Sequence, residues 1–244
     1  MILHGPPGTG KSFLIKRLKK MTNIKMCITA TSGVAAMLLN GCTIDHFLAK
    51  GYRKKKKTKF ETVRKNLGDA SLLILDEVSM MGSKKLLDVD KTLQKVKKNS
   101  SSFGGLDVIL VGDFAQLPAV KQISLIESMV RSTLLHTPPT ELTLKTSALM
   151  AMFVKFDIEE FKRSNSCSLL SSLLRRFRNS FCGSSSFSLE DIKRIGVLNK
   201  QTFVKDDKFR DASFLVATRK EKDAVISFAG KRWAEDHSRP LYWW

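Results

Sequence analysis

Short apolar runs alternate with amphipathic stretches through the first half of the chain. Runs rich in apolar side chains occupy residues 1–4, 25–31, 71–76 and 107–112. Runs of this kind are typical of strands buried on both faces of a sheet. The segments between them have helical spacing and are predicted to form helices at residues 11–20, 33–39 and 84–98. In the first of these, Phe13, Leu14 and Leu18 are expected on one face. This order predicts an α/β fold, a parallel sheet with helices on both faces.

The second half of the chain has a weaker pattern. Strands are predicted at residues 153–159 and 213–218, and helices at residues 168–178, 188–198 and 220–236. Leu169, Leu170, Leu173 and Leu174 are expected on the inner face of the helix at 168–178. The serine-rich segment 179–188 indicates a linker, the basic tract 52–60 a solvated loop, and residues 123–139 give no clear signal.

Composition narrows the class of protein. The chain has 244 residues, of which 43% are hydrophobic, enough for a packed core. Its apolar runs fall well short of the roughly 20 residues of a membrane helix, so no membrane partner is expected. Four cysteines lie far apart and the N-terminus resembles no secretory signal, which favours reduced thiols and an intracellular location.

The charge points to a polyanionic partner. There are 42 Lys and Arg against 23 Asp and Glu, a net charge of +19. Nucleic acid is the first candidate for such a surface. The basic run 53–57 would raise affinity through counterion release, or is a localisation signal or a solvated loop.

The most specific motif is a phosphate-binding loop. It satisfies the whole pattern G-x-x-x-x-G-K-[ST] with Gly5, Pro6, Pro7, Gly8, Thr9, Gly10, Lys11 and Ser12. Between a strand and a helix, such a loop wraps backbone N–H groups around the phosphates of ATP. Lys11 would reach the β- and γ-phosphates, and the Ser12 hydroxyl would bind Mg²⁺.

Two acids follow the apolar residues 72–75. Asp76 is in position to hold Mg²⁺, and Glu77 to polarise the attacking water. The alternative is a strand that merely runs into an acidic turn. Because carboxylates at the end of a buried strand are costly unless a cation or a reaction uses them, ATP hydrolysis is the favoured prediction.

A third motif selects the branch of these enzymes. Residues 111–118 read VGDFAQLP, and Gln116 could hydrogen-bond the γ-phosphate. Together with DEVSM at 76–80, TATSGVAA at 29–36 and GCTIDHF at 41–47, this string resembles superfamily-1B DNA helicases of the RecD-like and petite-integration-frequency branch. EFKRS at 160–164 is similar to that family's arginine-finger motif, with Arg163 as the finger.

The resemblance implies a RecA-like P-loop fold and a 5′–3′ ATP-dependent DNA helicase with roles in DNA repair, recombination and telomere maintenance. ATP and Mg²⁺ would be its cofactors, and single-stranded DNA or a forked duplex its partner; no stable protein partner is inferred. Candidate DNA contacts are Thr31, Ser32, Thr43 and His46. Thr31 and Ser32 could instead cap the following helix, and His46 could be structural. The location would be the nucleus or mitochondrion in a eukaryote and the cytoplasm in a bacterium.

The chain also departs from the family pattern. No adenine-contacting segment precedes Met1, the later motifs are absent, and residues 137–147 match poorly. We therefore expect a truncated helicase: a RecA-like ATP-binding motor domain at 1–150, a linker region with the arginine-finger motif at 151–187, and an incomplete second motor domain at 188–244. Such a chain would bind ATP and single-stranded DNA with impaired unwinding.

Two other functions remain open at this point. An AAA-type remodelling ATPase shares the string GPPGTGKS, although its fourth strand usually ends on a different polar sensor. A non-catalytic remnant could bind nucleic acid through its charge alone.

Overall fold

A computed structural model of the chain describes residues 1–50, 56–134, 138–163, 168–181, 188, 190, 218–236 and 238. The chain divides into two compact units, Met1–Ser186 and Phe187–Trp244. The second unit contains helix α11 (Arg219–Asp236), which confirms the helix expected at 220–236. Apart from residues 188, 190 and 218, the expected linker beyond 181, helix 188–198 and strand 213–218 lie outside the described residues. No described helix is long and apolar enough to cross a membrane.

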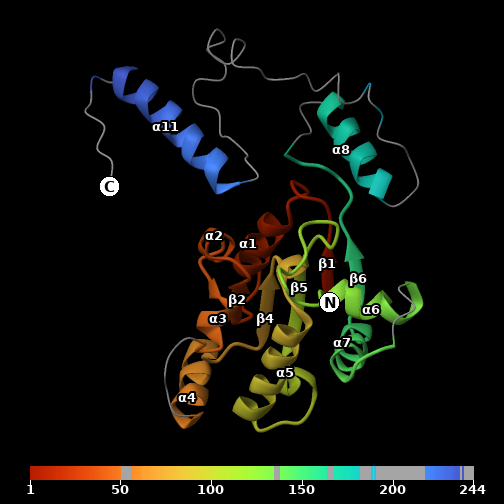
Figure 1. Ribbon diagram of the computed structural model, residues 1–244. Coiled ribbons are helices and arrows are strands. Elements are labelled where there is room, and N and C mark those ends of the chain that lie inside the picture. Colours follow the sequence, from red (N-terminus) through yellow and green to blue (C-terminus); the bar gives the residue numbers. More distant parts are fainter. Residues whose placement is uncertain are drawn as a thin grey trace. The chain divides into compact units, whose positions relative to one another are not determined.

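The first unit is built on a six-stranded sheet in the order β3-β2-β4-β5-β1-β6 (Figure 1). Every strand pairing is parallel. The strands are β1 (Ile2–His4), β2 (Met26–Ala30), β3 (Cys42–Thr43), β4 (Leu72–Asp76), β5 (Asp107–Gly112) and β6 (Lys155–Asp157). The expected parallel sheet is confirmed, with β3 as an additional short edge strand.

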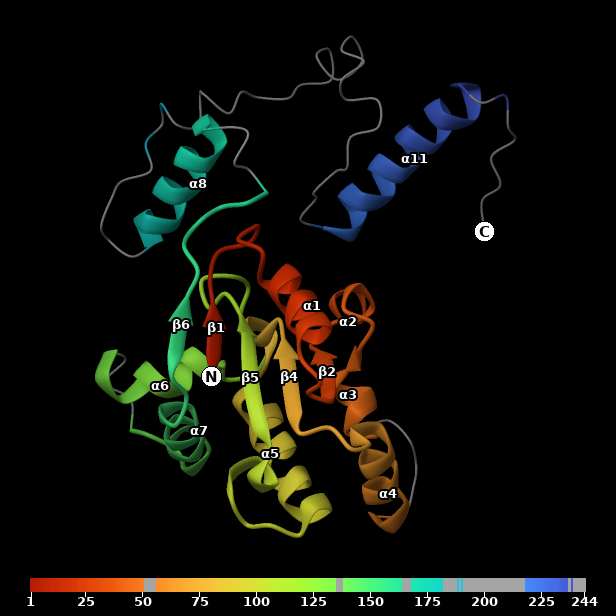
Figure 2. The same ribbon diagram turned by 180° about the vertical axis from the view of Figure 1, so that it is seen from behind.

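Helices cover both faces of this sheet, as Figures 1 and 2 show from opposite sides. One face packs against α1 (Lys11–Met21) and the segment around α2 (Gly33–Leu38). The other packs against α3 (Ile44–Phe47), α4 (Lys56–Leu67), α5 (Ser83–Lys97), α6 (Leu125–Leu134) and α7 (Glu141–Ala151). Strand β4 serves both cores, because Leu73 and Leu75 join the larger cluster while Leu72 and Ile74 join the smaller. A strand buried on both faces accounts for its unbroken apolar run.

The apolar face of α1 is only partly buried, and the expected inner face of α8 is wrong. In α1, Ile15 is buried and Leu18 packs against the core, whereas Phe13 is 68% exposed and Leu14 is also exposed. The sheet lies against the Ile15 side of the helix, which leaves Phe13 and Leu14 at the mouth of a cavity. Helix α8 (Ser168–Phe181) buries Leu173 and exposes the other three leucines, Leu169, Leu170 and Leu174.

The basic tract expected to be a loop is also corrected. Residues 51–55 lie outside the described part, but α4 begins at Lys56 within the tract. Lysine is a good helix former, and Val63 and Leu67 anchor the helix in the core. Beyond β5, α6 lies in the stretch 123–139 that gives no clear signal. Helix α7 follows that stretch, and Thr140 and Thr143 form the capping box that begins it.

Candidate active site

The phosphate-binding loop leaves the sheet at β1 and enters α1. Gly5 donates its N–H to the carbonyl of Gly112 (3.2 Å), and a Cβ on Gly5 would lie 2.4 Å from the Ile158 carbonyl oxygen. Gly8 (φ +83°) and Gly10 (φ +93°) adopt left-handed conformations that favour glycine. No side chain caps the start of α1, so its first N–H groups are available to an anion.

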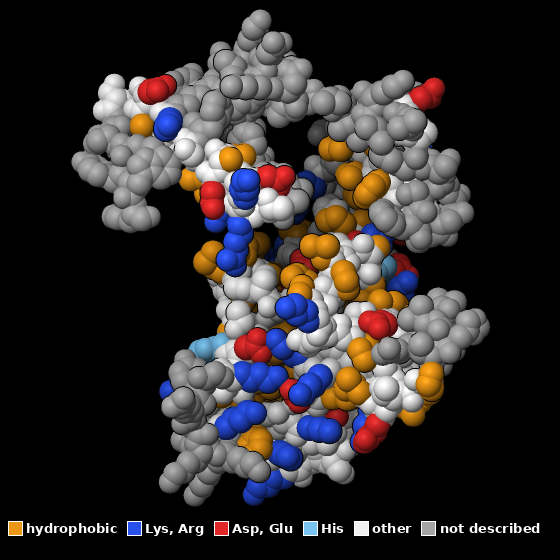
Figure 3. Space-filling model, viewed as in Figure 1, with side chains coloured by type: hydrophobic (Ala, Val, Ile, Leu, Met, Phe, Trp, Pro, Cys, Tyr) orange, Lys and Arg blue, Asp and Glu red, His pale blue; other side chains and the backbone are white. Residues whose placement is uncertain are grey.

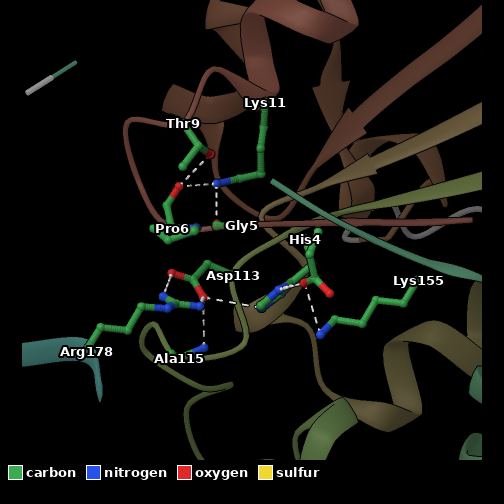
Figure 4. A network of polar contacts seen from close by, with 10 residues as sticks. His4, Gly5, Pro6, Thr9, Lys11, Asp113, Ala115, Lys155 and Arg178 are labelled. Carbon is green, nitrogen blue, oxygen red and sulfur yellow. Dashed lines mark hydrogen bonds and ion pairs between the residues drawn. The ribbon is translucent and has the colours of Figure 1, made fainter. Parts of the chain in front are cut away.

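Lys11 folds back on this loop (Figure 4). Its Nζ donates to the carbonyl oxygens of Gly5 (2.6 Å) and Pro6 (2.9 Å), and Thr9 Oγ1 also donates to Pro6 (2.8 Å). Burial lowers the pKa of Lys11, while nearby acids, Asp113 foremost, act in the opposite direction. The ammonium is therefore partly desolvated and held where phosphate oxygens could replace its two carbonyl partners.

The two acids at the end of β4 have different surroundings. Asp76 is only 4% exposed. Burial raises the pKa of Asp76 to about 6, although the N–H of Glu77 donates to its Oδ1 (2.9 Å) and acts in the other direction. Glu77 is half-buried and has a left-handed backbone (φ 55°), a strained conformation for a non-glycine residue that is typical of functional sites.

Gln116 lies on a turn that Asp113 holds together. Gln116 donates its N–H to the Asp113 carbonyl (2.9 Å), and Ala115 donates its N–H to Asp113 Oδ1 (3.1 Å). The turn follows β5 directly, at the sheet edge where β4 ends in Asp76. The parallel strands thus present both segments at the same edge.

Arg163 is fixed to the phosphate-binding loop through its backbone. Both Lys162 and Arg163 donate their N–H groups to the carbonyl of Gly8, at 2.8 and 2.9 Å. A Cβ added at Gly8 would lie 3.0 Å from Arg163 Cβ. The segment after β6 therefore depends on glycine at position 8 for its close approach.

These segments enclose one cavity of about 780 Å³. Its lining includes most of the residues expected at the ATP site: Pro7, Gly8, Thr9, Gly10, Lys11, Ser12, Asp76, Glu77, Gln116 and Arg163. Gly5 and Pro6 line a different cavity of about 430 Å³ and contact Lys11 through their carbonyls. Phe13, Leu14 and Lys162, which were not expected at the site, complete part of the wall.

The donor set suits Mg²⁺. Ser12 supplies a hydroxyl and Asp76 a buried carboxylate in the same cavity. No group of three or more His, Cys, Asp or Glu that could hold a metal occurs within the described ranges. Mg²⁺ fits this sparse set, because it usually takes one or two carboxylates together with substrate phosphates and water.

The candidate DNA contacts lie outside this cavity and make hydrogen bonds within the chain. Thr31 Oγ1 donates to the Glu77 carbonyl (2.9 Å). Ser32 accepts from the N–H of Ala35 and caps α2, and Thr43 accepts from the N–H of His46 and caps α3. Thr43 and His46 line a groove of about 450 Å³ beside α2. The capping alternative thus holds for Ser32, whereas Thr31 links its segment to Glu77.

A second polar network at the site contains residues that the sequence analysis did not single out. Asp113, 1% exposed, contacts His4 of β1 and Arg178 of α8 (Figure 4). Asp113 could have been singled out from its place before the Gln116 turn. Nothing in the sequence marks Arg178.

Comparison with known proteins decides the family. The sequence model described as PIF1-like helicase matches residues 1–168, more than half of the chain. The chain belongs to the PIF1-like helicase family. Among curated PIF1 proteins, the ATP-dependent DNA helicase PIF1 of Saccharomyces cerevisiae is 35% identical over 130 residues, 48% of this chain and 15% of the yeast protein.

Solved Pif1 helicases share the fold. A Pif1 structure described for DNA unwinding at forked duplex DNA by two coordinating helicases has a TM-score of 0.68 at 19% identity, covering 92% of this chain and 52% of that one. The Bacteroides Pif1 in complex with ADP-AlF3 and single-stranded DNA gives 0.66 at 20% identity, covering 93% and 52%. The chain therefore has the RecA-like P-loop fold and spans about half the length of these PIF1 structures.

Proposed function

We propose that the chain is an ATP-hydrolysing motor domain of a DNA helicase. The observation that carries the proposal is the single cavity that gathers Lys11, Ser12, Asp76, Glu77, Gln116 and Arg163. These residues come from segments spread over more than 150 positions, and each matches a separate requirement of phosphoryl transfer. Membership of the PIF1-like family supports this activity over AAA-type remodelling.

Each side chain has a distinct role in this proposal. Lys11 and the N–H groups at the start of α1 bind the β- and γ-phosphates. Ser12 and Asp76 would hold Mg²⁺, which would supply positive charge against the phosphates. Glu77 accepts a proton from the attacking water and Gln116 hydrogen-bonds the γ-phosphate. Arg163 offsets the negative charge that develops as the phosphoryl group leaves.

Single-stranded DNA or a forked duplex is the proposed partner, with 5′–3′ movement. Two observations support it: the net charge of +19, and solved Pif1 relatives described with single-stranded or forked DNA. Thr31, Ser32, Thr43 and His46 remain the proposed contacts. The hydrogen bond from Thr31 to the Glu77 carbonyl would join the DNA-facing segment to the hydrolytic acid.

We further propose motor-domain roles for 1–150, a finger-bearing linker for 151–187 and part of a second motor domain for 188–244. An intracellular location, nuclear, mitochondrial or bacterial cytoplasmic, accompanies this function.

The test is ATP hydrolysis with and without single-stranded DNA. We expect Mg²⁺-dependent turnover that DNA stimulates. Glu77→Gln should keep nucleotide bound yet stop turnover, because an amide cannot take the proton, and Lys11→Ala should lose nucleotide affinity. Absence of turnover together with salt-sensitive DNA binding would instead identify a non-catalytic nucleic-acid-binding protein.

A further inference from the structure

A buried ion pair joins helix α8 to the turn that carries Gln116. Arg178 donates from two guanidinium nitrogens to Asp113, with Nη1 at 2.6 Å from Oδ2 and Nη2 at 2.7 Å from Oδ1. Asp113 is 1% exposed and Arg178 about a quarter exposed. Arg178 lies 65 positions from Asp113 and beyond the residues that match the family.

Asp113 contacts both the turn that carries Gln116 and the strand that leads into the phosphate-binding loop. On one side its carboxylate and carbonyl accept the N–H groups of Ala115 and Gln116. On the other, His4 Nε2 lies 3.4 Å from Asp113 Oδ1, and His4 directly precedes the phosphate-binding loop. The His4 ring also stacks on Phe114 with centroids 5.7 Å apart, so the turn is fixed by side chains as well as by its backbone.

Arg178 matters electrostatically because the carboxylate is buried. Burial alone would raise the pKa of Asp113, but hydrogen bonds from His4 and Arg178 outweigh it and hold that pKa well below its usual range. The carboxylate therefore stays charged and keeps accepting hydrogen bonds from the turn. A forked guanidinium fixes both oxygens at once, which a single ammonium cannot do.

We propose that Arg178 is a positioning residue for γ-phosphate recognition, acting through Asp113 to set the turn so that Gln116 faces the phosphates. The inference rests on the proposed function and adds a control point to the same site. Helix α8 is the last helix described before the second unit begins at Phe187. A change in the position of α8 would therefore reach the turn that carries Gln116 through this ion pair.

The test compares the affinities of ATPγS and ADP, with Mg²⁺, in the full chain. Arg178→Lys keeps a positive charge near Asp113, so it avoids leaving that carboxylate uncompensated. We expect it to reduce the preference for ATPγS over ADP about tenfold, as for one hydrogen bond to a charged group. Gln116→Ala should cause a similar loss, and the double variant should lose no more than either. In turnover, KM for ATP should rise in step with the weaker ATPγS binding.

Arg175→Lys is the matched control. Arg175 lies on the same helix, over the Phe161 ring at 5.9 Å, so the same change there should leave the preference intact. Equal effects at positions 175 and 178, additive losses in the double variant, or an unchanged preference in Arg178→Lys would each overturn the inference. A parent chain that binds no nucleotide would overturn the proposed function, whereas one that binds both nucleotides equally would overturn only the role of the sensor turn.

Discussion

Adjacent residues Asp76 and Glu77 lie at the same strand end but in different surroundings. Asp76 is buried beneath the cavity and its pKa is raised to about 6. Glu77 is half-buried, and its strained backbone turns it out of the strand direction. In the proposed function, these different surroundings would give the two like groups different roles, a metal ligand for Asp76 and a proton acceptor for Glu77.

The raised pKa of Asp76 predicts a pH-dependent affinity for Mg²⁺. Below about pH 6 the carboxyl is protonated and Mg²⁺ must displace the proton; above it the carboxylate is free. One unit below the pKa, this competition should weaken Mg²⁺ binding by about tenfold. The measurement is Mg²⁺-dependent nucleotide binding at pH 5.0 and 7.5.

Asp76→Asn separates this effect from titration of the nucleotide. The variant should bind Mg²⁺ more weakly and retain only the pH dependence that the phosphates contribute. If parent and variant show the same pH profile, Asp76 does not compete with protons for the metal.

At the scale of elements, strands with two covered faces were predictable and surface helices less so. Strands β2, β4 and β5 carry apolar runs because both cores use them. The start of α4 was predicted as a loop because it is rich in lysine, and the buried residues Val63 and Leu67 come only later in the helix. The inner faces of α1 and α8 depend on tertiary packing that spacing alone does not determine.

The site residues also fall into those that the sequence predicts and those that it does not. Phosphate-loop and carboxylate residues could be found because strand, turn and helix place them at fixed positions along the sequence. The contact between Arg178 and Asp113 joins segments with no shared motif, so only the folded chain reveals it.

Helix α7 offers a test of local stability. The Thr140 hydroxyl accepts from the N–H of Thr143, and the Thr143 hydroxyl accepts from the N–H of Thr140. Thr140→Ala should lower the free energy of unfolding by about 1 kcal/mol, because it leaves an N-terminal N–H without its cap. Thr140→Ser keeps the hydroxyl and serves as the control in urea denaturation. Equal midpoints for the two variants would show that the cap does not stabilise the helix.

At the scale of the whole molecule, positive charge dominates the described surface. Lys and Arg side chains gather over α4 and α5 on the face shown in Figure 3. Exposed lysines follow one side of α5 at helical spacing: Lys84, Lys91 and Lys95. The chain as a whole carries +19, so long-range attraction should draw polyanions to it.

Binding of single-stranded DNA should therefore depend steeply on salt. The slope of log K against log salt is about −0.7 for each neutralised phosphate, so about four contacts would reduce affinity roughly 50-fold between 50 and 200 mM salt. Fluorescence anisotropy with a labelled oligonucleotide measures it. An uncharged morpholino of the same sequence is the control and should show no such slope. A flat response with DNA would mean that the charge does not contact the backbone.

Unwinding by the 244-residue chain alone is expected to fail. Translocation requires two motor domains that close over ATP and reopen, whereas the described residues contain one parallel sheet with one such cavity. Strand displacement on a 5′-tailed duplex should stay at the level of Glu77→Gln, while ATP and DNA still bind. Robust displacement would show that one such sheet suffices or that copies of the chain cooperate.

Strand β4 tolerates substitutions but not changes in length. Its side chains alternate between two cores, and it ends on Asp76, whose carboxylate lines the cavity of the site. Exchange of one aliphatic side chain for another of similar volume costs little. Deletion of one residue within β4 would turn each following side chain of that strand to the opposite face of the sheet. It would also shift the Asp76 carboxylate along the strand by about 3.3 Å. Drift in this segment should therefore appear as substitutions, while changes in length accumulate only in the loops that flank it.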